Sequence, residues 1–286
     1  MKHQLKKKFS KESGVKEKII LEGYSHKPKK SLGQNFLKSE KALSKICEAG
    51  NLSSSDVVLE IGPGKGALTE RLLRLGVKVV AIEKDDLLVD FLKEKFQNEI
   101  KNKKLILIHE DILDFEIPKN IKKYKIIANI PYNITGAILK KFLEEQSQPT
   151  DMILLVQKEV AERVVARDGK ESILSISIKI YGIPKYIMTV NKRFFSPAPK
   201  VDSAIIQITS ISKNNLPNKN FEKLFFDVLK AGFAHKRKFV FSNLVKNFNQ
   251  KEEIQAVFEF LGIKMSARAE NLSVQDWIEI TKRLLF

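Results

Sequence analysis

The five residues from Asn129 to Asn133, with the sequence NIPYN, follow directly after the apolar run IIA. The run predicts a buried strand, so the motif stands where that strand ends. The Asn129 side-chain oxygen could accept a hydrogen bond from an exocyclic amine. Pro131 fixes the local φ, so the Ile130 carbonyl could accept a second bond, and Tyr132 could stack on a flat ring. This chemistry suits a nucleobase, although a strand-ending Asn-Pro turn with a buried tyrosine would leave the same pattern.

A glycine loop could bring the backbone close to a second ligand. Gly62, Gly64 and Gly66 follow one predicted strand and precede a helix, whose amino terminus adds a positive dipole end. The spacing G-x-G-x-G, with Glu60 just before it, departs from the G-x-G-x-x-G of dinucleotide sites. A plain tight turn is the alternative interpretation of these glycines.

Two acidic residues stand at the ends of the next two predicted strands. Glu83 could accept hydrogen bonds from both ribose hydroxyls of a nucleoside, and Asp111 could accept one from an adenine amino group. Each acid alone would usually be a solvated turn residue. The carboxyl ends of parallel strands share one crevice, however, so these features together predict a single nucleoside site beside NIPYN.

Alternating strands and helices position these groups. Apolar runs predict strands at 56–61, 78–83, 105–109, 124–129 and 151–157, and periodic patterns predict helices at 39–50, 66–76, 85–97 and 134–145. The strands are apolar on both faces, as in a parallel sheet covered by helices on both sides. This order predicts a doubly wound α/β domain.

The second half of the chain changes character. Residues 172–181 fit a helix and a strand equally well, and 185–190 with 202–209 predict a hairpin that closes the sheet. Residues 210–220 are polar and predict a linker. About four short helices follow between Phe221 and Leu285, which indicates a small all-α domain.

The formal net charge of +17 over 286 residues favours a polyanionic partner, most plausibly nucleic acid. A Lys-rich proteome that simply makes basic proteins is the alternative. Residues 1–30 hold ten Lys and three Glu and predict a flexible basic tail. No apolar run is long enough for a membrane helix or signal peptide, which predicts a cytoplasmic protein. The single Cys47 fits a buried core residue, and four scattered histidines predict no metal site.

Six motifs in order resemble one family: KSLGQNFL, EIGPGKGALT, IEKD, EDIL, NIPYN and FSPAPKVDSAI. They are similar to those of the rRNA adenine N6,N6-dimethyltransferases, over roughly residues 28–286. QKEVAERV, FSPAPKVDSA and AGFAHKRKFVFSNL resemble the KsgA-type branch, which modifies small-subunit rRNA, more than the erythromycin-resistance branch, which modifies large-subunit rRNA. Ile130 stands where the first branch usually has Leu, a difference of little weight at a position expected to act through its carbonyl.

The resemblance implies a fold and a division into domains. It implies the Rossmann-like sheet of class I S-adenosylmethionine-dependent methyltransferases, seven-stranded and mostly parallel with the last strand antiparallel, and a small all-α C-terminal domain. It resolves 172–181 as a helix. The expected domains are a basic tail at 1–30, a catalytic domain at 31–211 and a helical RNA-binding domain at 212–286. The family also implies a monomer.

The resemblance further assigns roles within the site. Gln34, Asn35 and Leu37 would cover the methionine end of S-adenosylmethionine, with Gly62, Gly64 and Glu60 beneath it. Glu83 would hold the ribose and Asp111 with Ile112 the adenine. Asn129 would contact both the cofactor and the target amine. Tyr132 and Phe195 would sandwich the flipped adenine.

The implied reaction is N6,N6-dimethylation of two adjacent adenosines in the 3′-terminal hairpin of 16S rRNA, within a pre-30S particle during ribosome biogenesis. Arg193 and Lys200 could guide the hairpin toward the pocket. Lys236, Arg237 and Lys238, expected at the start of a C-terminal helix, could contact phosphates or form a solvated helix face. Two other functions stay open: a non-catalytic assembly factor on this fold, and a resistance-type enzyme acting on 23S rRNA.

Overall fold

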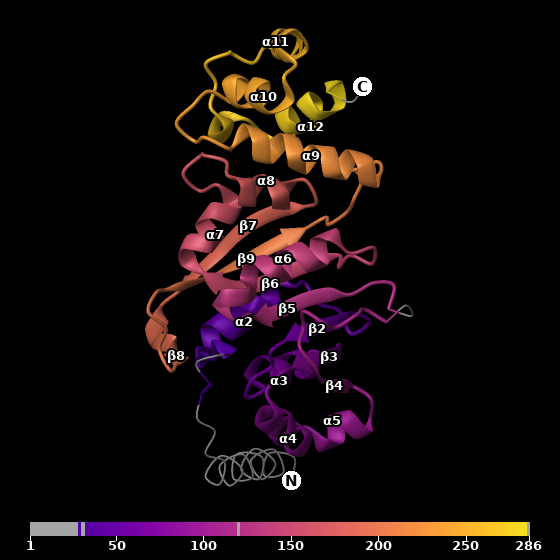
Figure 1. Cartoon of the computed structure of the whole chain (residues 1–286). Helices are drawn as coiled ribbons and strands as arrows, with labels where there is room; N and C mark the ends of the chain where they lie inside the picture. Colours follow the sequence, from indigo (N-terminus) through magenta and orange to yellow (C-terminus); the bar gives the residue numbers. More distant parts are fainter. Residues whose placement is uncertain (1–27, 30–31, 119–120, 285–286) are drawn as a thin grey trace, which may run out of the picture.

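A seven-stranded sheet runs through the centre of the molecule (Figure 1). The computed structural model describes residues 28–29, 32–118 and 121–284. In chain order the strands are β2 (Val57–Ile61), β3 (Lys78–Glu83), β4 (Leu105–His109), β5 (Lys125–Asn129), β6 (Asp151–Gln157), β7 (Ile183–Val190) and β9 (Ser203–Thr209). Their spatial order is β4-β3-β2-β5-β6-β9-β7. The first five run parallel, and β9 lies antiparallel between β6 and β7, so the predicted sheet with an antiparallel last strand is confirmed.

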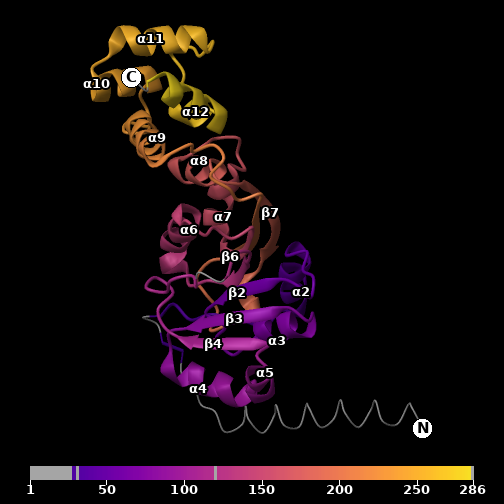
Figure 2. The ribbon, with the colours of Figure 1, turned by 90° about the vertical axis from the view of Figure 1, so that its right-hand side faces the viewer.

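Helices cover both faces of the sheet because successive strand residues point to opposite sides. The helices of the first part are α2 (Glu40–Ala49), α3 (Ala67–Arg74), α4 (Asp86–Lys95), α5 (Gln97–Lys101), α6 (Thr135–Glu144), α7 (Lys158–Val165) and α8 (Ile173–Lys179). Val58 packs in the core with α2 and α3, whereas its neighbour Leu59 packs in the core with α6 and α7. Figure 2 shows α2 and α6 on opposite sides of the sheet.

The helix α8 settles the ambiguous segment 172–181. Ser172 caps it by accepting from the backbone N–H of Ser175, and the Ser175 hydroxyl accepts from the N–H of Ser172 in return. This capping box favours a helix start because it satisfies two donors that a new helix leaves free. The helix that the resemblance implied is therefore confirmed.

Four helices form the C-terminal part: α9 (Lys219–Gly232), α10 (Val240–Phe248), α11 (Lys251–Phe260) and α12 (Val274–Arg283). The predicted linker is fastened to the end of α8, since Asn215 donates to the Ile180 carbonyl at 3.0 Å and the Ser212 N–H donates to the Tyr181 carbonyl at 2.9 Å. One apolar core runs from the sheet through α8 into these helices, where Trp277 is buried. The boundary predicted at residue 212 stays a prediction.

The segment HKRK at 235–238 lies in the exposed turn between α9 and α10, so its predicted place at the start of a helix is wrong. The helix α9 continues to Gly232, and α10 begins only at Val240. Asn243 ties the turn down by donating to the carbonyls of Gly232 and His235. Within the described residues, no helix has the length and apolar character needed to cross a membrane.

The predicted basic tail falls almost wholly on residues 1–27 and lies outside the described residues. The two tail residues that are described, Pro28 and Lys29, contact the sheet-containing part: Pro28 lines a cavity there, and the Lys29 ammonium pairs with Asp85 and Asp86. These two residues therefore pack with that part of the molecule.

Candidate active site

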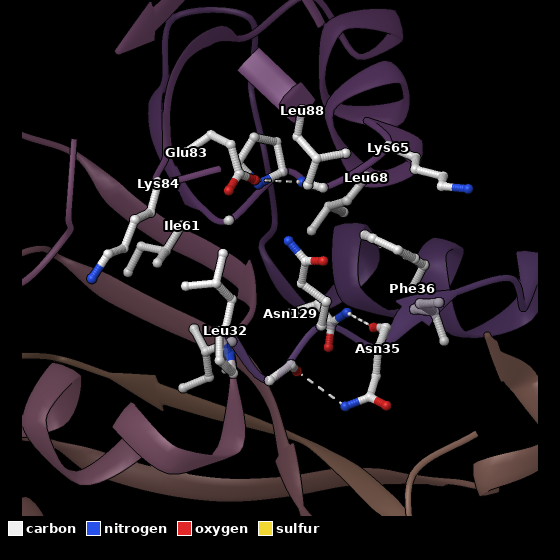
Figure 3. Close-up of a pocket in the computed structure, with 18 of the residues that line it drawn as sticks. Leu32, Asn35, Phe36, Ile61, Lys65, Leu68, Glu83, Lys84, Leu88 and Asn129 are labelled. Atoms are coloured by element: carbon white, nitrogen blue, oxygen red, sulfur yellow. Dashed lines mark hydrogen bonds between the residues drawn. The ribbon is translucent and has the colours of Figure 1, made fainter. Parts of the chain in front are cut away.

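A cavity of about 480 Å³ opens at the carboxyl ends of β2, β3, β4 and β5. Figure 3 shows residues around it from the ends of β2, β3 and β5, such as Ile61, Glu83 and Asn129, and from the segment before α2, such as Asn35. The predicted site residues that line it are Gln34, Asn35, Leu37, Glu60, Gly62, Gly64, Glu83, Asp111, Ile112, Asn129, Ile130, Pro131 and Tyr132. The fold thus gathers side chains from 34 to 132 around one space.

The glycine loop forms the floor of this cavity between β2 and α3. Gly62 and Gly64 have φ values of 63° and 59°, in the left-handed region that a residue with a side chain rarely adopts. A Cβ atom on Gly62 would meet no other atom within 4 Å, so that position faces open space. The loop therefore leaves room for a ligand directly above its backbone.

Glu83 closes the loop from the end of β3. Its two carboxylate oxygens accept from the backbone N–H groups of Gly64 at 3.1 Å and Asp85 at 2.9 Å. Figure 3 shows the first of these bonds. Burial raises the pKa of the Glu83 carboxyl. Because a carboxylate has about four acceptor positions, Glu83 keeps capacity for a ligand's hydroxyl groups.

Glu60, the next-to-last residue of β2, is 1% exposed. Burial, reinforced by the nearby Glu83, raises its pKa from 4.5 to about 8. Its Oε2 atom has no hydrogen-bond partner among the described residues. A buried oxygen without a partner costs free energy, which a ligand with a hydrogen-bond donor would recover.

Asp111 lies beyond β4, at the far side of the cavity from NIPYN. Its carboxylate accepts from the Lys84 ammonium at 2.6 Å and from the Leu113 N–H at 3.0 Å. The Lys84 bond is the main reason that the pKa of Asp111 lies below its usual value. Asp111 is therefore a charged acceptor, with the buried Ile112 beside it as an apolar wall.

The segment Leu32–Lys38, which we call the strap, crosses the cavity before α2. Both ends of the Gln34 amide are bonded: its oxygen accepts from the Lys29 N–H, and its nitrogen donates to Asp85, each at 2.7 Å. The Asn35 carbonyl accepts from the Asn129 side chain at 3.1 Å, a bond drawn in Figure 3. At the end of the strap, β1 (Phe36–Leu37) pairs with β8 (Phe195–Ser196).

The NIPYN residues form the wall opposite Asp111. Asn129 is the last residue of β5, Ile130 has a buried side chain, and Pro131 leads into the 3-10 turn η2 (Tyr132–Ile134). The Tyr132 hydroxyl lies 2.6 Å from the Ser203 hydroxyl at the start of β9. Burial raises the pKa of Tyr132. Ser203 thus holds the aromatic ring at the edge of the cavity.

The comparisons with known proteins agree with this geometry. Residues 25–285 match the family described as ribosomal RNA adenine dimethylase. The chain belongs to this family. The protein named ribosomal RNA small subunit methyltransferase A from Dehalococcoides mccartyi (strain CBDB1) is 41% identical over 91% of this chain and 89% of its own length. The protein of the same name from Fusobacterium nucleatum is 39% identical over 90% of this chain and 97% of its own length.

Two solved structures share the fold. A dimethyladenosine transferase from Plasmodium falciparum has a TM-score of 0.74 and 28% identity, covering 86% of this chain and 95% of its own. The 23S rRNA methyltransferase ErmE has a TM-score of 0.73 and 25% identity, covering 87% and 99%. The resemblance predicted from six motifs is confirmed, and the chain is an rRNA adenine dimethyltransferase.

Phe195 is the one predicted catalytic residue that does not line the cavity of this adenine dimethylase. Its side chain is 4% exposed and packs in the core beside Leu37, whereas the preceding Phe194 is 37% exposed. Its neighbour Ser196 does line the cavity. Stacking of Phe195 on a base stays a prediction, and it requires the loop around β8 to uncover the ring.

The predicted RNA-contact residues are all exposed but fall in two places. Arg193 and Lys200 flank β8, with the Arg193 guanidinium 5.1 Å from the centre of the Phe194 ring. Lys236, Arg237 and Lys238 lie in the α9–α10 turn. Figure 1 shows β8 and that turn toward opposite ends of the molecule's long axis. One short stretch of RNA could therefore not contact both groups of residues.

The sequence patterns did not single out three residues that hold side chains lining the cavity: Asp85 bonds Gln34, Ser203 bonds Tyr132, and Lys84 bonds Asp111. Asp85 caps α4 by accepting from the Leu87 N–H, and a helix-start pattern would have found that role. Its bond to Gln34, far away along the chain, leaves no local signal, and neither does the contact between Ser203 and Tyr132. The part of the chain that is described contains no group of three His, Cys, Asp or Glu placed to hold a metal, and the predicted absence of a metal stays a prediction.

Proposed function

We propose that this enzyme transfers methyl groups from S-adenosylmethionine to N6 of two adjacent adenosines in the 3′-terminal hairpin of 16S rRNA. Its substrate would be a pre-30S particle, and it would act as a cytoplasmic monomer in ribosome biogenesis. The names of the relatives at 39% and 41% identity support the small subunit as substrate. The observation that carries the proposal is the place of Asn129, which lines the cavity at the end of β5 beside the aromatic Tyr132.

The residues of the cavity fit S-adenosylmethionine. The open space above Gly62 admits a ligand close to the backbone, and Glu83 retains acceptor capacity for two ribose hydroxyls. Asp111 and Ile112 would hold the adenine, while Glu60 and the strap lie where the methionine part would be covered. The bound donor supplies a methyl group on a positively charged sulfur, so the protein needs no nucleophile of its own.

The protein's task is then to position and polarise the target amine. An adenine N6 amine is a weak nucleophile because its lone pair is delocalised into the ring. Asn129 Oδ1 and the Ile130 carbonyl would accept its two N–H bonds and favour a pyramidal nitrogen with the lone pair freed. These acceptors gain strength as positive charge develops on N6, so they favour the transition state over the ground state.

A target base must leave its stack before it can reach the cavity, at a cost of a few kcal/mol. The Tyr132 ring, held by Ser203 at the cavity wall, would recover part of that cost by stacking. Arg193 and Lys200 would hold the backbone of the hairpin near β8, and the exposed charges of the α9–α10 turn would contact a more distant phosphate group.

The test is methyl incorporation from labelled S-adenosylmethionine into purified ribosomal subunits that lack the modification. We expect label in the 16S rRNA of small subunits, at two adjacent adenosines near the 3′ end, and none in 23S rRNA. Label in 23S rRNA alone would establish the resistance-type activity instead. The similarity to ErmE is the reason for testing this alternative.

The non-catalytic assembly factor is a second candidate, and it predicts a different result in cells. A chain with Asn129→Ala would keep its fold and its surface charge while losing an acceptor for the target amine. If that variant fully restores small-subunit assembly in a strain lacking the enzyme, methylation is dispensable. The complete set of cavity residues supports catalysis, because a pure binding factor has no use for an open glycine loop.

A further inference from the structure

Two hydrogen bonds fasten the strap on both sides of the cavity. On the cofactor side, the Gln34 amide nitrogen donates to Asp85 Oδ2 at 2.7 Å. On the reaction side, the Asn129 amide nitrogen donates to the Asn35 carbonyl at 3.1 Å. Gln34 and Asn35 are adjacent in the chain, so a shift of one moves the other. The strap therefore links Asp85 to Asn129 across the cavity.

Asp85 is a firm anchor for this link. Its side chain is fully buried, while the side chain of the next residue, Asp86, is 66% exposed. Asp85 Oδ1 accepts from the Leu87 N–H at 3.2 Å and pairs with the Lys29 ammonium at 2.9 Å. Its own N–H donates to Glu83. The anchor is thus fixed to the start of α4 and to the predicted ribose-binding residue.

The bond to Asn35 determines which end of the Asn129 amide faces the target. The oxygen and nitrogen of an amide have nearly the same shape, so only hydrogen bonds distinguish the two orientations. With Nδ2 directed at the Asn35 carbonyl, Oδ1 is the end left to accept from an amine. The reversed amide would present its own N–H groups to the N–H groups of the target, and donor would face donor.

We infer that Asp85 is a positioning residue for methyl transfer: through Gln34 it holds the Asn35 carbonyl where that carbonyl orients the Asn129 amide. This inference rests on the proposed role of Asn129 as acceptor for the target amine. It also gives Gln34 a role different from a cofactor contact, since both ends of its amide are engaged with Lys29 and Asp85.

A reciprocal exchange of the two side chains tests the link. In Asp85→Asn, the new amide nitrogen faces the Gln34 amide nitrogen, so two donors oppose each other. In Gln34→Glu, the new carboxylate faces the Asp85 carboxylate, so two acceptors oppose each other. Each single change breaks the bond. In the double variant Gln34→Glu/Asp85→Asn, the amide at position 85 donates to the carboxylate at position 34, which still accepts from the Lys29 N–H. The bond returns with its donor and acceptor exchanged.

We expect each single variant to lower the single-turnover methylation rate at saturating S-adenosylmethionine by about tenfold, which corresponds to about 1.4 kcal/mol. The affinity for S-adenosylhomocysteine, measured by calorimetry, should change by less than about threefold, which corresponds to a change in binding free energy of less than roughly 0.6 kcal/mol. The double variant should recover most of the rate, as coupled residues do in a double-mutant cycle. Asp86→Asn is the matched control and should leave the rate unchanged.

Two results would overturn the inference. If the single variants lose affinity for S-adenosylhomocysteine but regain the full rate at saturating donor, Gln34 is a cofactor contact. If the double variant is no faster than the singles, the bond between the two residues is not what matters. Gln34→Leu, uncharged and of similar size, serves if a single variant fails to fold. The wild-type rate on each subunit separately tests the proposed function, and the variants are compared on whichever subunit the wild type methylates.

Discussion

The two halves of the cavity are built differently. In the half that we propose to bind the cofactor, the cofactor half, Glu83 is buried and bonded to two backbone N–H groups, and the Asp111 carboxylate is held by an ammonium and a backbone N–H. In the half that we propose to bind the target base, the base half, one hydrogen bond among the described residues holds the Asn129 side chain, one holds Tyr132, and Phe195 is buried in the core. The side chains of the cofactor half are thus held by more hydrogen bonds than those of the base half.

This difference follows from what each half must bind. A small donor molecule that is the same in every cycle is bound best by groups that already lie in place, because no ordering cost arises on binding. The target base proposed above arrives as part of a large RNA, and its amine changes as each methyl group is added. Side chains that are held by single bonds and by a short loop can rearrange around it, as complexes with RNA often require.

The largest expected effect comes from Asn129→Ala in the base half. The variant loses the side-chain acceptor for the target amine, and we expect the methylation rate to fall by roughly 10²–10³-fold or more, as for removal of one preorganised transition-state contact. Rates are measured in single turnover on small subunits.

Affinity for S-adenosylhomocysteine serves as the control in this experiment and should fall far less than the rate, because the cofactor half keeps its carboxylates. Equal losses of rate and affinity would show that Asn129 belongs to the cofactor half, and the comparison between the halves would fail.

The next largest effect separates the two neighbouring rings at β8. Phe195→Leu keeps most of the buried apolar volume but removes the aromatic face. If Phe195 turns out to stack on the base, the rate should fall by about tenfold, since base stacking on an aromatic ring is worth about 1–3 kcal/mol. Phe194→Leu is the matched change at the exposed ring and should leave the rate within about twofold, as most surface changes do.

The reverse outcome would also be informative. A loss of rate in Phe194→Leu, with Phe195→Leu unaffected, would mean that the exposed ring beside Arg193 meets the RNA and that Phe195 is a core residue. Thermal unfolding of both variants distinguishes a stacking role from a packing role.

The same contrast explains what could be predicted from the sequence. Glu83 and Asp111 stand at strand ends, where parallel topology alone brings side chains together, so their shared cavity was predictable. The helix α8 was ambiguous because its apolar residues fit both periods, and local capping by Ser172 decides it. Asp85 with Gln34, and Tyr132 with Ser203, meet through tertiary contacts between distant segments, for which the sequence has no periodic signal.

A pH-dependent effect on stability tests the burial of Glu60 in the cofactor half. Its pKa is about 8 in the folded chain, while in the unfolded chain it returns to near 4.5. Between these values the folded state keeps a proton that the unfolded state releases. Stability of the ligand-free enzyme therefore falls as pH rises through this range, by at most about 1.4 kcal/mol per pH unit from this group.

Glu60→Gln cannot titrate, so we expect the variant to lose this contribution. The free energy of unfolding in urea, measured for the variant and the wild type, should differ least at pH 5. As the pH is raised to 8, the variant's value should rise relative to that of the wild type. Glu83 remains in both chains, so the difference between them reports Glu60 together with its coupling to Glu83. A difference between the two chains that stays constant over this range would mean that Glu60 is ionised in the folded protein, and that the cofactor half carries a second buried charge.

The smallest effect concerns the α9–α10 turn, whose residues do not line the cavity. Replacing Lys236, Arg237 and Lys238 by Gln should weaken binding to small subunits and leave the single-turnover rate at saturating enzyme unchanged. Each lost phosphate contact reduces the slope of log affinity against log salt by about 0.7–0.9. The measurement is the dissociation constant over a series of salt concentrations.

The control replaces Lys101, Lys104 and Lys123, which lie before or beside the amino ends of β4 and β5 and thus on the opposite edge of the sheet from the cavity. Both variants remove three positive charges, so an effect confined to the first one assigns the α9–α10 turn to the RNA, and equal effects in both would reduce its role to net charge alone.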